Sequence, residues 1–322
     1  MTRRLQAAFL DFATLGPGVD TAPLDELADV AYYTSTPLEQ TVERLDGMDI
    51  AIVNKARIDA EAIAKSDRLK LIVLAATGSD NVDVQTAEQR GVGVANIRDY
   101  CTAAVVQHVF ALVLGLTRKL AEYQAAIYGG AWQSSETFAL FDFPIRELSG
   151  KALGIVGFGT LGKGVAQLGR SLDMEILVSA RPGTSADDVP SGRLALEEVL
   201  ERADVLSLHC PLTDATRGLI GETQLRRMKA DALLVNTARG ALIDSRALVA
   251  ALKAGEIGGA GIDVMETEPP RGDEPLLEPG IPNLILTPHI AWTARESRQR
   301  ALDQVAENIK DFLAGGSLRR LV

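Results

Sequence analysis

Three ionisable residues in the second half of the sequence each follow a short run of strand-forming residues: Arg239, Glu268 and His289. Their types suit the reduction of a carbonyl group. Hydride addition to a 2-keto acid leaves negative charge on the carbonyl oxygen, which then needs a proton, and histidine is the natural donor near neutral pH. A neighbouring carboxylate favours the protonated imidazole. Arginine binds a carboxylate through two parallel hydrogen bonds and also polarises a carbonyl.

Each of these residues, taken alone, has an ordinary alternative role as a solvated charge or a structural histidine. The carboxyl ends of parallel strands meet at one edge of a sheet, where ligands bind, so we expect the three to converge there. Of the two other histidines, His108 lies in an apolar helical stretch and is interpreted as a core residue. His209 stands at a strand end, where it could lie near a cofactor.

A glycine-rich segment upstream has the pattern G-x-G-x-x-G and lies between an apolar strand and a helix. That context is the one that a dinucleotide-binding loop requires. The first glycine permits a tight turn, the second lets the backbone approach a pyrophosphate, and the third lets helix and strand pack closely. The helix N-terminus offers free N–H groups to the phosphates. The cofactor-binding residues predicted here are Gly157, Phe158, Gly159, Thr160, Leu161 and Gly162.

The acidic residue that usually accompanies this loop is missing. It is expected about 20 positions later, at the end of the second strand, where it binds the ribose hydroxyls. Here Ala180 and Arg181 follow the strand expected at 176–179. Without the carboxylate nothing repels a 2′-phosphate, and Arg181 can bind one through charge-assisted hydrogen bonds. We therefore expect NADP (NADPH) to be favoured and NAD to be possible. The alternative is that Arg181 is a solvated loop residue.

The elements that must position these residues alternate between strand and helix, which predicts parallel sheets covered on both faces. A long apolar helix over 102–126 and an aromatic-rich segment over 128–143 separate two such units. Expected helices lie at 23–28, 37–45, 59–65, 161–172, 196–201, 222–228, 245–254 and 294–313. Expected strands lie at 7–10, 50–53, 71–75, 92–94, 152–156, 176–179, 205–208, 233–236, 261–264 and 284–286.

Composition narrows the class of protein. The 322 residues are enough for two domains, and the hydrophobic share of 47% supplies two cores. The net charge of −10 argues against nucleic-acid and anionic-membrane partners. Two distant cysteines, Cys101 and Cys210, form neither a metal motif nor a disulfide framework. With no signal-peptide pattern and no apolar run long enough for a membrane span, a cytoplasmic protein without a metal site is expected.

The segments that carry these motifs resemble the D-isomer-specific 2-hydroxyacid dehydrogenase family, almost from end to end. The resemblance implies an α/β fold of two doubly wound parallel-sheet domains. One is a flavodoxin-like substrate domain of residues 1–100, completed by 292–322. The other is a Rossmann dinucleotide-binding domain of residues 101–291. The similarity is strongest at 154–164, 204–220, 233–244, 258–270 and 287–292.

The resemblance also implies roles for individual residues. Arg239, Glu268 and His289 match the family's catalytic residues. The loop 76–81 resembles the one whose backbone N–H groups hold the substrate carboxylate, and Asp263 resembles the residue that hydrogen-bonds the nicotinamide amide. Further cofactor-binding residues implied are Cys210, Pro211, Thr216, Thr237, Ala238 and Asp263, in addition to the Arg181 argued above. Substrate-binding residues implied are Asn54, Thr77, Gly78, Ser79 and Trp292.

Within the family, three features favour reduction of glyoxylate or hydroxypyruvate: the Val53-Asn54-Lys55 segment, Trp292, and an insertion at 279–282. Trp292 has an alternative role in core or dimer packing. The apolar helix and the aromatic segment predict a homodimer. Two other functions stay open at this point, a non-catalytic dinucleotide-sensing protein like the corepressors built on this fold, and a dehydrogenase of another small acid.

Overall fold

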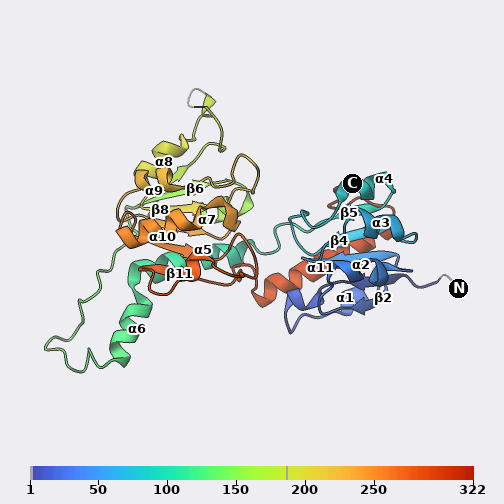
Figure 1. Ribbon diagram of the computed structural model, residues 1–322, viewed down its shortest axis with the longest axis horizontal. Coiled ribbons are helices and arrows are strands. Elements are labelled where there is room, and N and C mark those ends of the chain that lie inside the picture. Colours follow the sequence, from blue (N-terminus) through green and yellow to red (C-terminus); the bar gives the residue numbers. More distant parts are fainter. Residues whose placement is uncertain (1–2, 186–187) are drawn as a thin grey trace. The chain divides into compact units, whose positions relative to one another are not determined.

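The computed structural model describes residues 3–185 and 188–322, and the chain divides into two compact units (Figure 1). One unit spans the chain up to Cys101 and adds Trp292–Val322, and the other is Thr102–Ala291. Each contains one sheet in which every strand pair is parallel. The expected α/β class with two parallel sheets is confirmed.

The sheet of the first unit has the strand order β2-β1-β3-β4-β5. β3 and β4 are buried along their whole length, as expected for central parallel strands. The strands are β1 (Gln6–Phe9), β2 (Asp29–Tyr32), β3 (Ile50–Val53), β4 (Leu71–Leu74) and β5 (Gly93–Ala95). The helices are η1 (Phe12–Leu15), α1 (Ala22–Asp25), α2 (Leu38–Leu45), α3 (Ala60–Lys65), α4 (Val84–Gln89) and α11 (Arg295–Leu313).

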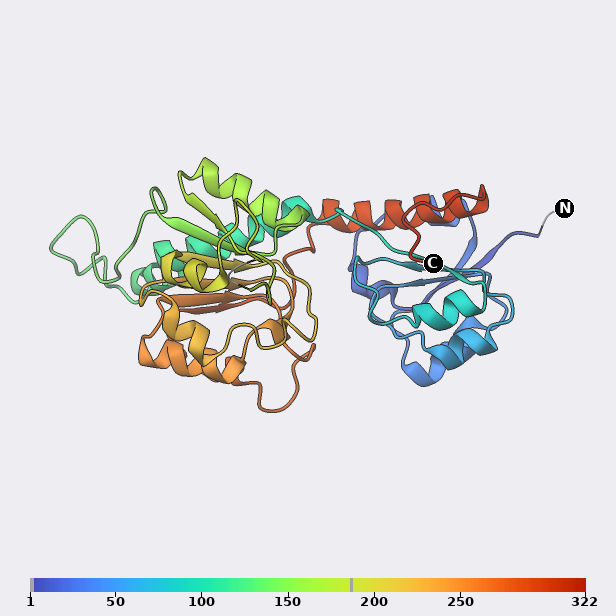
Figure 2. The ribbon, with the colours of Figure 1, turned by 90° about the horizontal axis from the view of Figure 1, so that it is seen from above.

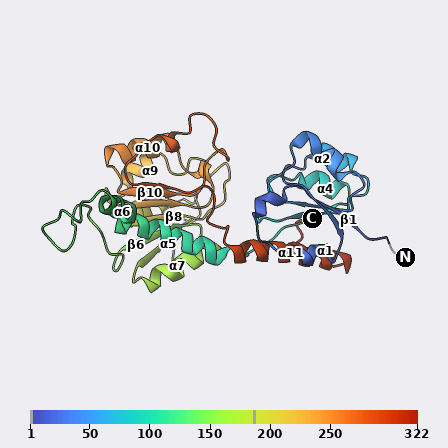
Figure 3. The ribbon, with the colours of Figure 1, turned by 90° about the horizontal axis from the view of Figure 1, so that it is seen from below.

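Helix α11, at the end of the chain, covers one face of this sheet. Its buried residues Leu302, Val305 and Ile309 pack with Phe9 and Ile52 in one core cluster. The opposite face has its own cluster, to which α3 and α4 contribute Ile63 and Ala87. Figure 3 shows α11 and α1 on one side of the sheet and α2 and α4 on the other. The C-terminal helix therefore completes the N-terminal unit.

The sheet of the second unit has the order β11-β10-β9-β8-β6-β7. The chain goes from β6 to β7 on one side and then crosses to β8 on the other, so β6 lies at the point where strand order reverses. The strands are β6 (Ala152–Val156), β7 (Glu175–Val178), β8 (Val205–Leu208), β9 (Leu233–Asn236), β10 (Gly259–Ile262) and β11 (Leu284–Leu286). The helices are α5 (Thr102–Arg118), α6 (Leu120–Tyr128), α7 (Thr160–Ser171), α8 (Leu196–Arg202), α9 (Glu222–Arg227), η3 (Gly240–Leu242), α10 (Ser245–Ala254) and η4 (Pro275–Leu277).

Glycines let α5 lie close to its neighbours in this unit. A Cβ on Gly261 of β10 would come within 2.8 Å of the Cβ of Leu112 on α5, and a Cβ on Gly164 of α7 would come within 2.8 Å of Val106. α5 and α7 thus cover one face of the sheet, while α9 and α10 cover the other (Figure 3). This close packing brings side chains of α5 to the ends of β10 and β11.

The structure differs from the sequence-based expectations at three elements. The helix expected over 102–126 is broken at Lys119, whose φ of 55° is left-handed, so α5 and α6 are separate helices bent by 53°. Strand β2 was not expected, because it is a sheet-edge strand with mostly half-buried side chains and gives no clear apolar pattern. Helix α4 was not expected either. It has only six residues, and the Asp83 carboxylate caps it by accepting from the N–H of Thr86.

Helix α6 and the segment after it extend away from the sheet of their unit (Figures 1 and 2). Among the residues that the structure describes, no single helix is long and apolar enough to cross a membrane. The bent pair α5–α6 meets the length and composition criteria only when taken together.

Candidate active site

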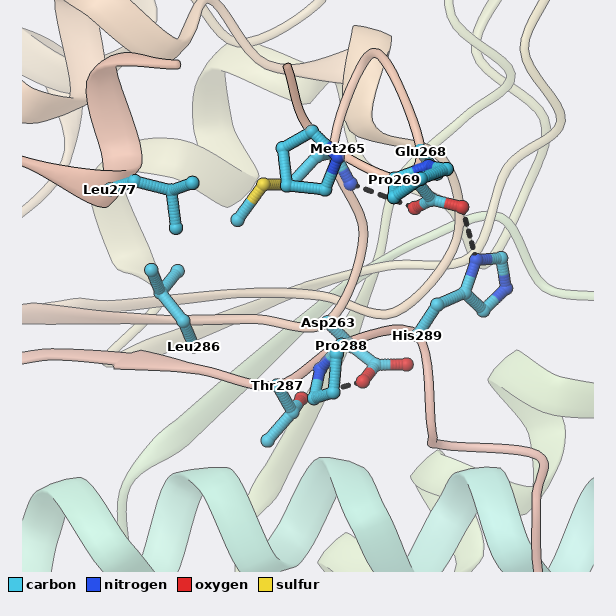
Figure 4. A pocket seen from close by; sticks show the side chains of 10 residues that line it. Asp263, Met265, Glu268, Pro269, Leu277, Leu286, Thr287, Pro288 and His289 are labelled. Carbon is cyan, nitrogen blue, oxygen red and sulfur yellow. Dashed lines mark hydrogen bonds and ion pairs between the residues drawn. The ribbon is translucent and has the colours of Figure 1, made fainter. Parts of the chain in front are cut away.

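Glu268 and His289 form a direct pair at the carboxyl ends of β10 and β11. His289 Nδ1 lies 2.5 Å from Glu268 Oε2. The other carboxylate oxygen, Oε1, accepts a hydrogen bond from the backbone N–H of Met265 at 2.9 Å (Figure 4). Both side chains are about one-third exposed or less, so water and small ligands reach them. The pair has the geometry of an imidazole oriented by a carboxylate.

Asp263 holds the backbone around His289. Its main-chain carbonyl accepts from the N–H of His289 at 2.7 Å. Its carboxylate accepts from the N–H groups of Ile290 and Ala291, each at 2.9 Å. Burial alone would raise the pKa of Asp263, but hydrogen bonds from His108, Thr287 and these two amides bring it below its usual value. Asp263 is therefore an anion that clamps the turn carrying His289.

Arg239 lies on the loop after β9, next to the loop that carries Glu268. A Cβ on Gly240 would lie 2.0 Å from the main-chain carbon of Met265, so only glycine allows the two loops this contact. Asn236 fixes the Arg239 loop, since its side chain donates to the carbonyl of Arg239 and accepts from the N–H of Ala238. The exposed guanidinium donates to the carbonyl of Ala238 at 2.7 Å. The structure thus joins Glu268 and His289 and leaves Arg239 on the adjacent loop.

A cavity of about 460 Å³ adjoins the Glu268–His289 pair. Apolar side chains from β11 and η4 make much of its wall, including Leu286 and Leu277 (Figure 4). Its lining is Asp263, Met265, Glu268, Pro269, Pro270, Leu277, Leu286, Thr287, Pro288 and His289.

The glycine-rich loop connects β6 to α7 and has the shape that a pyrophosphate needs. Gly157 has φ of 93°, and a Cβ there would lie 2.5 Å from the backbone of Cys210. A Cβ on Gly162 would lie 2.1 Å from the carbonyl oxygen of Gly157. None of the described residues beyond its chain neighbours lies within 4 Å of a Cβ on Gly159, the residue before the first turn of α7. The first and third glycines therefore close the loop, and the second leaves open space at the helix N-terminus, which fits a bound dinucleotide.

A second cavity, of about 830 Å³, opens beside this loop. Thr216 fixes the loop that forms part of the cavity wall. Its hydroxyl donates to the carbonyl of Pro211 at 2.8 Å and accepts from the N–H of Thr213 at 2.7 Å. Burial raises the pKa of the Cys210 thiol, so Cys210 provides a neutral wall. The residues that line this second cavity are Gly157, Phe158, Gly159, Ser179, Ala180, Arg181, Pro182, Pro190, Arg193, His209, Cys210, Pro211, Thr213, Ala215 and Thr216.

Of the other predicted cofactor residues, Thr160 and Leu161 begin α7, and Thr237 and Ala238 lie on the loop after β9. The hydroxyl of Thr237 is buried and has no hydrogen-bond partner among the described residues. His209 lines the larger cavity, and burial lowers its pKa to about 4. The lowered pKa favours the neutral imidazole at physiological pH.

Sequence reasoning missed the second arginine of this cavity. Arg193 lies 12 residues after Arg181 and lines the same cavity. The guanidinium carbon of Arg193 is 4.8 Å from the centre of the Phe158 ring. An N–H of the same guanidinium group donates to the carbonyl of Ser179 at 3.3 Å. The sequence gives no signal for it, because its loop brings it back to the glycine-rich turn only in the folded chain.

The predicted substrate residues lie in the first unit and are described within it. Asn54 is buried, and its amide donates to the hydroxyl of Thr14 at 3.0 Å. The hydroxyl of Thr77 donates to the carbonyl of Ile97 at 2.9 Å, which fixes the loop containing Gly78 and Ser79.

Trp292 packs edge-on against Tyr100, with ring centres 6.1 Å apart. It lies at the border of the first unit's core, so the packing alternative for Trp292 has structural support.

Comparison with known proteins decides the family. Residues 110–291 match the model of the D-isomer specific 2-hydroxyacid dehydrogenase NAD binding domain. The chain is 44% identical to glycerate dehydrogenase of Methylorubrum extorquens over 88% of each chain. The chain belongs to the D-isomer-specific 2-hydroxyacid dehydrogenases. This dehydrogenase is also 35% identical to hydroxypyruvate reductase of Blautia hydrogenotrophica, over 97% of this chain and 98% of that one.

The dehydrogenase fold is shared by a solved acyclic imino acid reductase in complex with NADPH and D-Arg. The TM-score is 0.85 and the identity 28%, over 99% of this chain and all of that one. The resemblance noted in the sequence is therefore confirmed, and so is the enzyme interpretation. The protein is an oxidoreductase that uses a nicotinamide dinucleotide to reduce small 2-keto acids.

The described geometry shows what the dehydrogenase contributes beyond the cofactor, which supplies the hydride when bound. The Glu268 carboxylate contacts the Nδ1 atom of His289, and Nε2 is the other ring nitrogen that can carry a proton. Arg239 lies on the adjacent loop with an exposed guanidinium group. The apolar walls of the smaller cavity lower the local dielectric beside the Glu268–His289 pair.

Proposed function

We propose that this D-2-hydroxyacid dehydrogenase reduces hydroxypyruvate or glyoxylate, with His289 as the proton donor, Glu268 as its carboxylate partner and Arg239 as the group that binds the substrate carboxylate. The observation that carries the catalytic part is the 2.5 Å contact between His289 and Glu268. The substrate class is supported by the names of the relatives, a glycerate dehydrogenase and a hydroxypyruvate reductase.

The test of the substrate is a kinetic panel. NADPH oxidation is followed at 340 nm with glyoxylate, hydroxypyruvate, pyruvate and longer 2-keto acids, and kcat/KM is compared among them. We expect hydroxypyruvate or glyoxylate to have the highest value by at least about tenfold, a difference of about 1.4 kcal/mol in transition-state binding. A branched or aromatic 2-keto acid at the top of the panel would replace this assignment with another small acid.

We propose NADPH as the preferred cofactor. Ala180 is buried at the end of β7 and supplies no carboxylate for the ribose diol. Arg181 and Arg193 both line the larger cavity, beside the glycine-rich loop. Two guanidinium groups, with no acidic side chain among the described lining residues, make the lining complementary to a 2′-phosphate. The solved relative that holds NADPH supports the same choice.

We propose that the enzyme is a homodimer formed through α6 and the segment after it. Several of its large apolar side chains are exposed, and Phe138 is 91% exposed. Apolar groups gathered on one exposed segment mark an interface, and a two-fold dimer is the commonest way to cover one. Those exposed by more than half are Leu120, Tyr128, Trp132, Phe138 and Phe141.

We also propose that the enzyme works in the cytoplasm. Cys101 and Cys210 are both free thiols in the structure. Burial raises the pKa of each thiol, which keeps them protonated and unreactive. Unpaired cysteines are usual in a reducing compartment.

A further inference from the structure

A hydrogen-bonded chain leads from helix α5 to the turn that carries His289. His108, on α5, places its Nε2 atom 2.9 Å from the hydroxyl of Thr287. That hydroxyl lies 2.5 Å from the Oδ1 atom of Asp263. His108 Nε2 is itself 3.5 Å from the same carboxylate oxygen. Figure 4 shows Thr287 and Asp263 joined in this way beside the pocket. His108 is therefore not the plain core residue that its apolar helix suggested.

The direction of each hydrogen bond in this chain follows from the atoms present. A threonine hydroxyl has one proton, and Thr287 donates it to the Asp263 carboxylate. The hydroxyl can then only accept from His108, so Nε2 of His108 carries a hydrogen. Asp263, whose pKa these bonds lower, remains an acceptor throughout.

The same carboxylate fixes the backbone at His289. Its two oxygens accept from the N–H groups of Ile290 and Ala291, and its main-chain carbonyl accepts from the N–H of His289. His289 has φ of 56°, a left-handed conformation that is uncommon for residues other than glycine, although histidine adopts it more often than most. Such a conformation persists only where its surroundings hold it. The hydrogen bonds to Asp263 stabilise this conformation, and the Asp263 side chain is itself oriented by Thr287 and His108.

We propose that His108 is a positioning residue for the catalytic step: through Thr287 it orients the Asp263 carboxylate, which fixes the left-handed turn that aims His289 at Glu268. The inference rests on the proposed role of His289 as the proton donor. It assigns no contact between His108 and the substrate or cofactor. Small displacements of a catalytic group are costly, since an error of about 1 Å lowers a rate by up to about 100-fold.

The test replaces, one at a time, the first two residues of the hydrogen-bonded series from His108 through Thr287 to Asp263. His108→Leu keeps an apolar body in α5 but removes the donor, and Thr287→Val removes the next link at nearly constant shape. Each should lower kcat by about 10- to 100-fold, with the KM for NADPH changed by less than about threefold. His108→Gln keeps an N–H donor at a similar reach and should recover most of kcat. Gln107→Ala, at an exposed position on the same helix, is the control and should behave as wild type.

The double variant His108→Leu/Thr287→Val decides whether the two residues act as one unit. If they do, its kcat equals that of the worse single variant, whereas independent effects multiply. The proposal is overturned by wild-type kcat in Thr287→Val, by no recovery in His108→Gln, or by multiplying losses. Should His108→Leu fail to fold, as judged by circular dichroism, Thr287→Val and His108→Gln still decide the matter.

A parallel measurement on His289→Asn separates this inference from the proposed function. Near wild-type kcat in His289→Asn would remove His289 as the donor. Loss of activity in His289→Asn together with full activity in His108→Leu and Thr287→Val would overturn only the positioning role of His108.

Discussion

The Nδ1 atom of His289 lies 2.5 Å from Oε2 of Glu268, although the two residues are 21 positions apart and belong to loops after different strands. Glu268 is held in turn by the backbone N–H of Met265. One ring nitrogen, Nδ1, is therefore engaged by a carboxylate, and Nε2 is the nitrogen that would donate the proton in the proposed mechanism.

Replacement of His289 should remove catalysis and spare cofactor binding. His289→Asn is the most suitable variant, because asparagine tolerates the left-handed backbone found at this position. We expect kcat to fall by at least about 100-fold, the lower end for a lost acid–base group. Fluorescence titration should show NADPH affinity within about threefold of wild type. Turnover close to wild type would remove His289 from the mechanism.

Replacement of Glu268 by glutamine tests the charge of the pair apart from its shape. The amide oxygen of glutamine can still accept from the N–H of Met265, so the loop should be retained. The variant loses the charge-assisted hydrogen bond between Glu268 and His289, which is worth about 1.5–3 kcal/mol. If that bond forms fully only in the transition state, its loss lowers the rate by roughly 10- to 150-fold. We expect kcat at pH 7 to fall within that range. Glu266→Gln, an exposed carboxylate two residues away, is the matched control and should leave kcat unchanged.

Arg181 and Arg193 should together determine the preference for NADPH. Each charged contact to a 2′-phosphate is worth about 1.5–3 kcal/mol, so kcat/KM with NADPH should exceed that with NADH by at least about tenfold. Arg181→Ala and Arg193→Ala should each reduce that ratio and leave NADH kinetics nearly unchanged. Ala180→Asp should shift the preference toward NADH by adding repulsion and a ribose acceptor. Equal use of both cofactors by the wild type would make Arg181 a solvated loop residue.

The stability contribution of Asp263 should depend on pH in a defined direction. Its pKa in the folded protein is lowered, so its stabilisation is complete above the unfolded value of about 3.9 and is lost as the pH falls through the lower folded value. Asp263→Asn should cost about 1.5–3 kcal/mol of unfolding free energy at pH 7. Urea unfolding should show a constant difference between the two proteins from about pH 8 to 5, narrowing below about pH 4. A difference that stays constant to pH 3 would contradict this account.

Charged substitutions on the exposed apolar segment should separate the proposed dimer. Wild-type enzyme should scatter light as a particle of about twice the chain mass of 34.3 kDa. Phe138→Asp combined with Phe141→Asp should reduce that mass to one chain, because a buried unpaired carboxylate is strongly unfavourable at an interface. Leu318→Asp, at an exposed apolar position in the first unit, should leave the mass unchanged. A wild-type mass of one chain at micromolar concentration would refute the dimer.

Local patterns in the sequence determined the α/β class, the glycine-rich loop and the strand ends where Arg239, Glu268 and His289 stand. Apolar runs of strand length and glycines at fixed spacing depend on neighbouring residues, so one sequence reveals them. The family followed from the same segments. The sequence predicts one continuous helix over 102–126, because nothing in its apolar composition indicates the left-handed Lys119 that breaks it.

Only the tertiary structure decided which side chains act on one another at a distance. Arg193 reaches the cofactor cavity because its loop folds back onto Phe158, and His108 meets Thr287 because Gly261 lets α5 lie close against β10. The clamp of Asp263 on the turn at His289 joins the ends of two strands separated in sequence. The physical reason is that such contacts arise from packing between elements, and the spacing of residues along the chain carries no direct record of it.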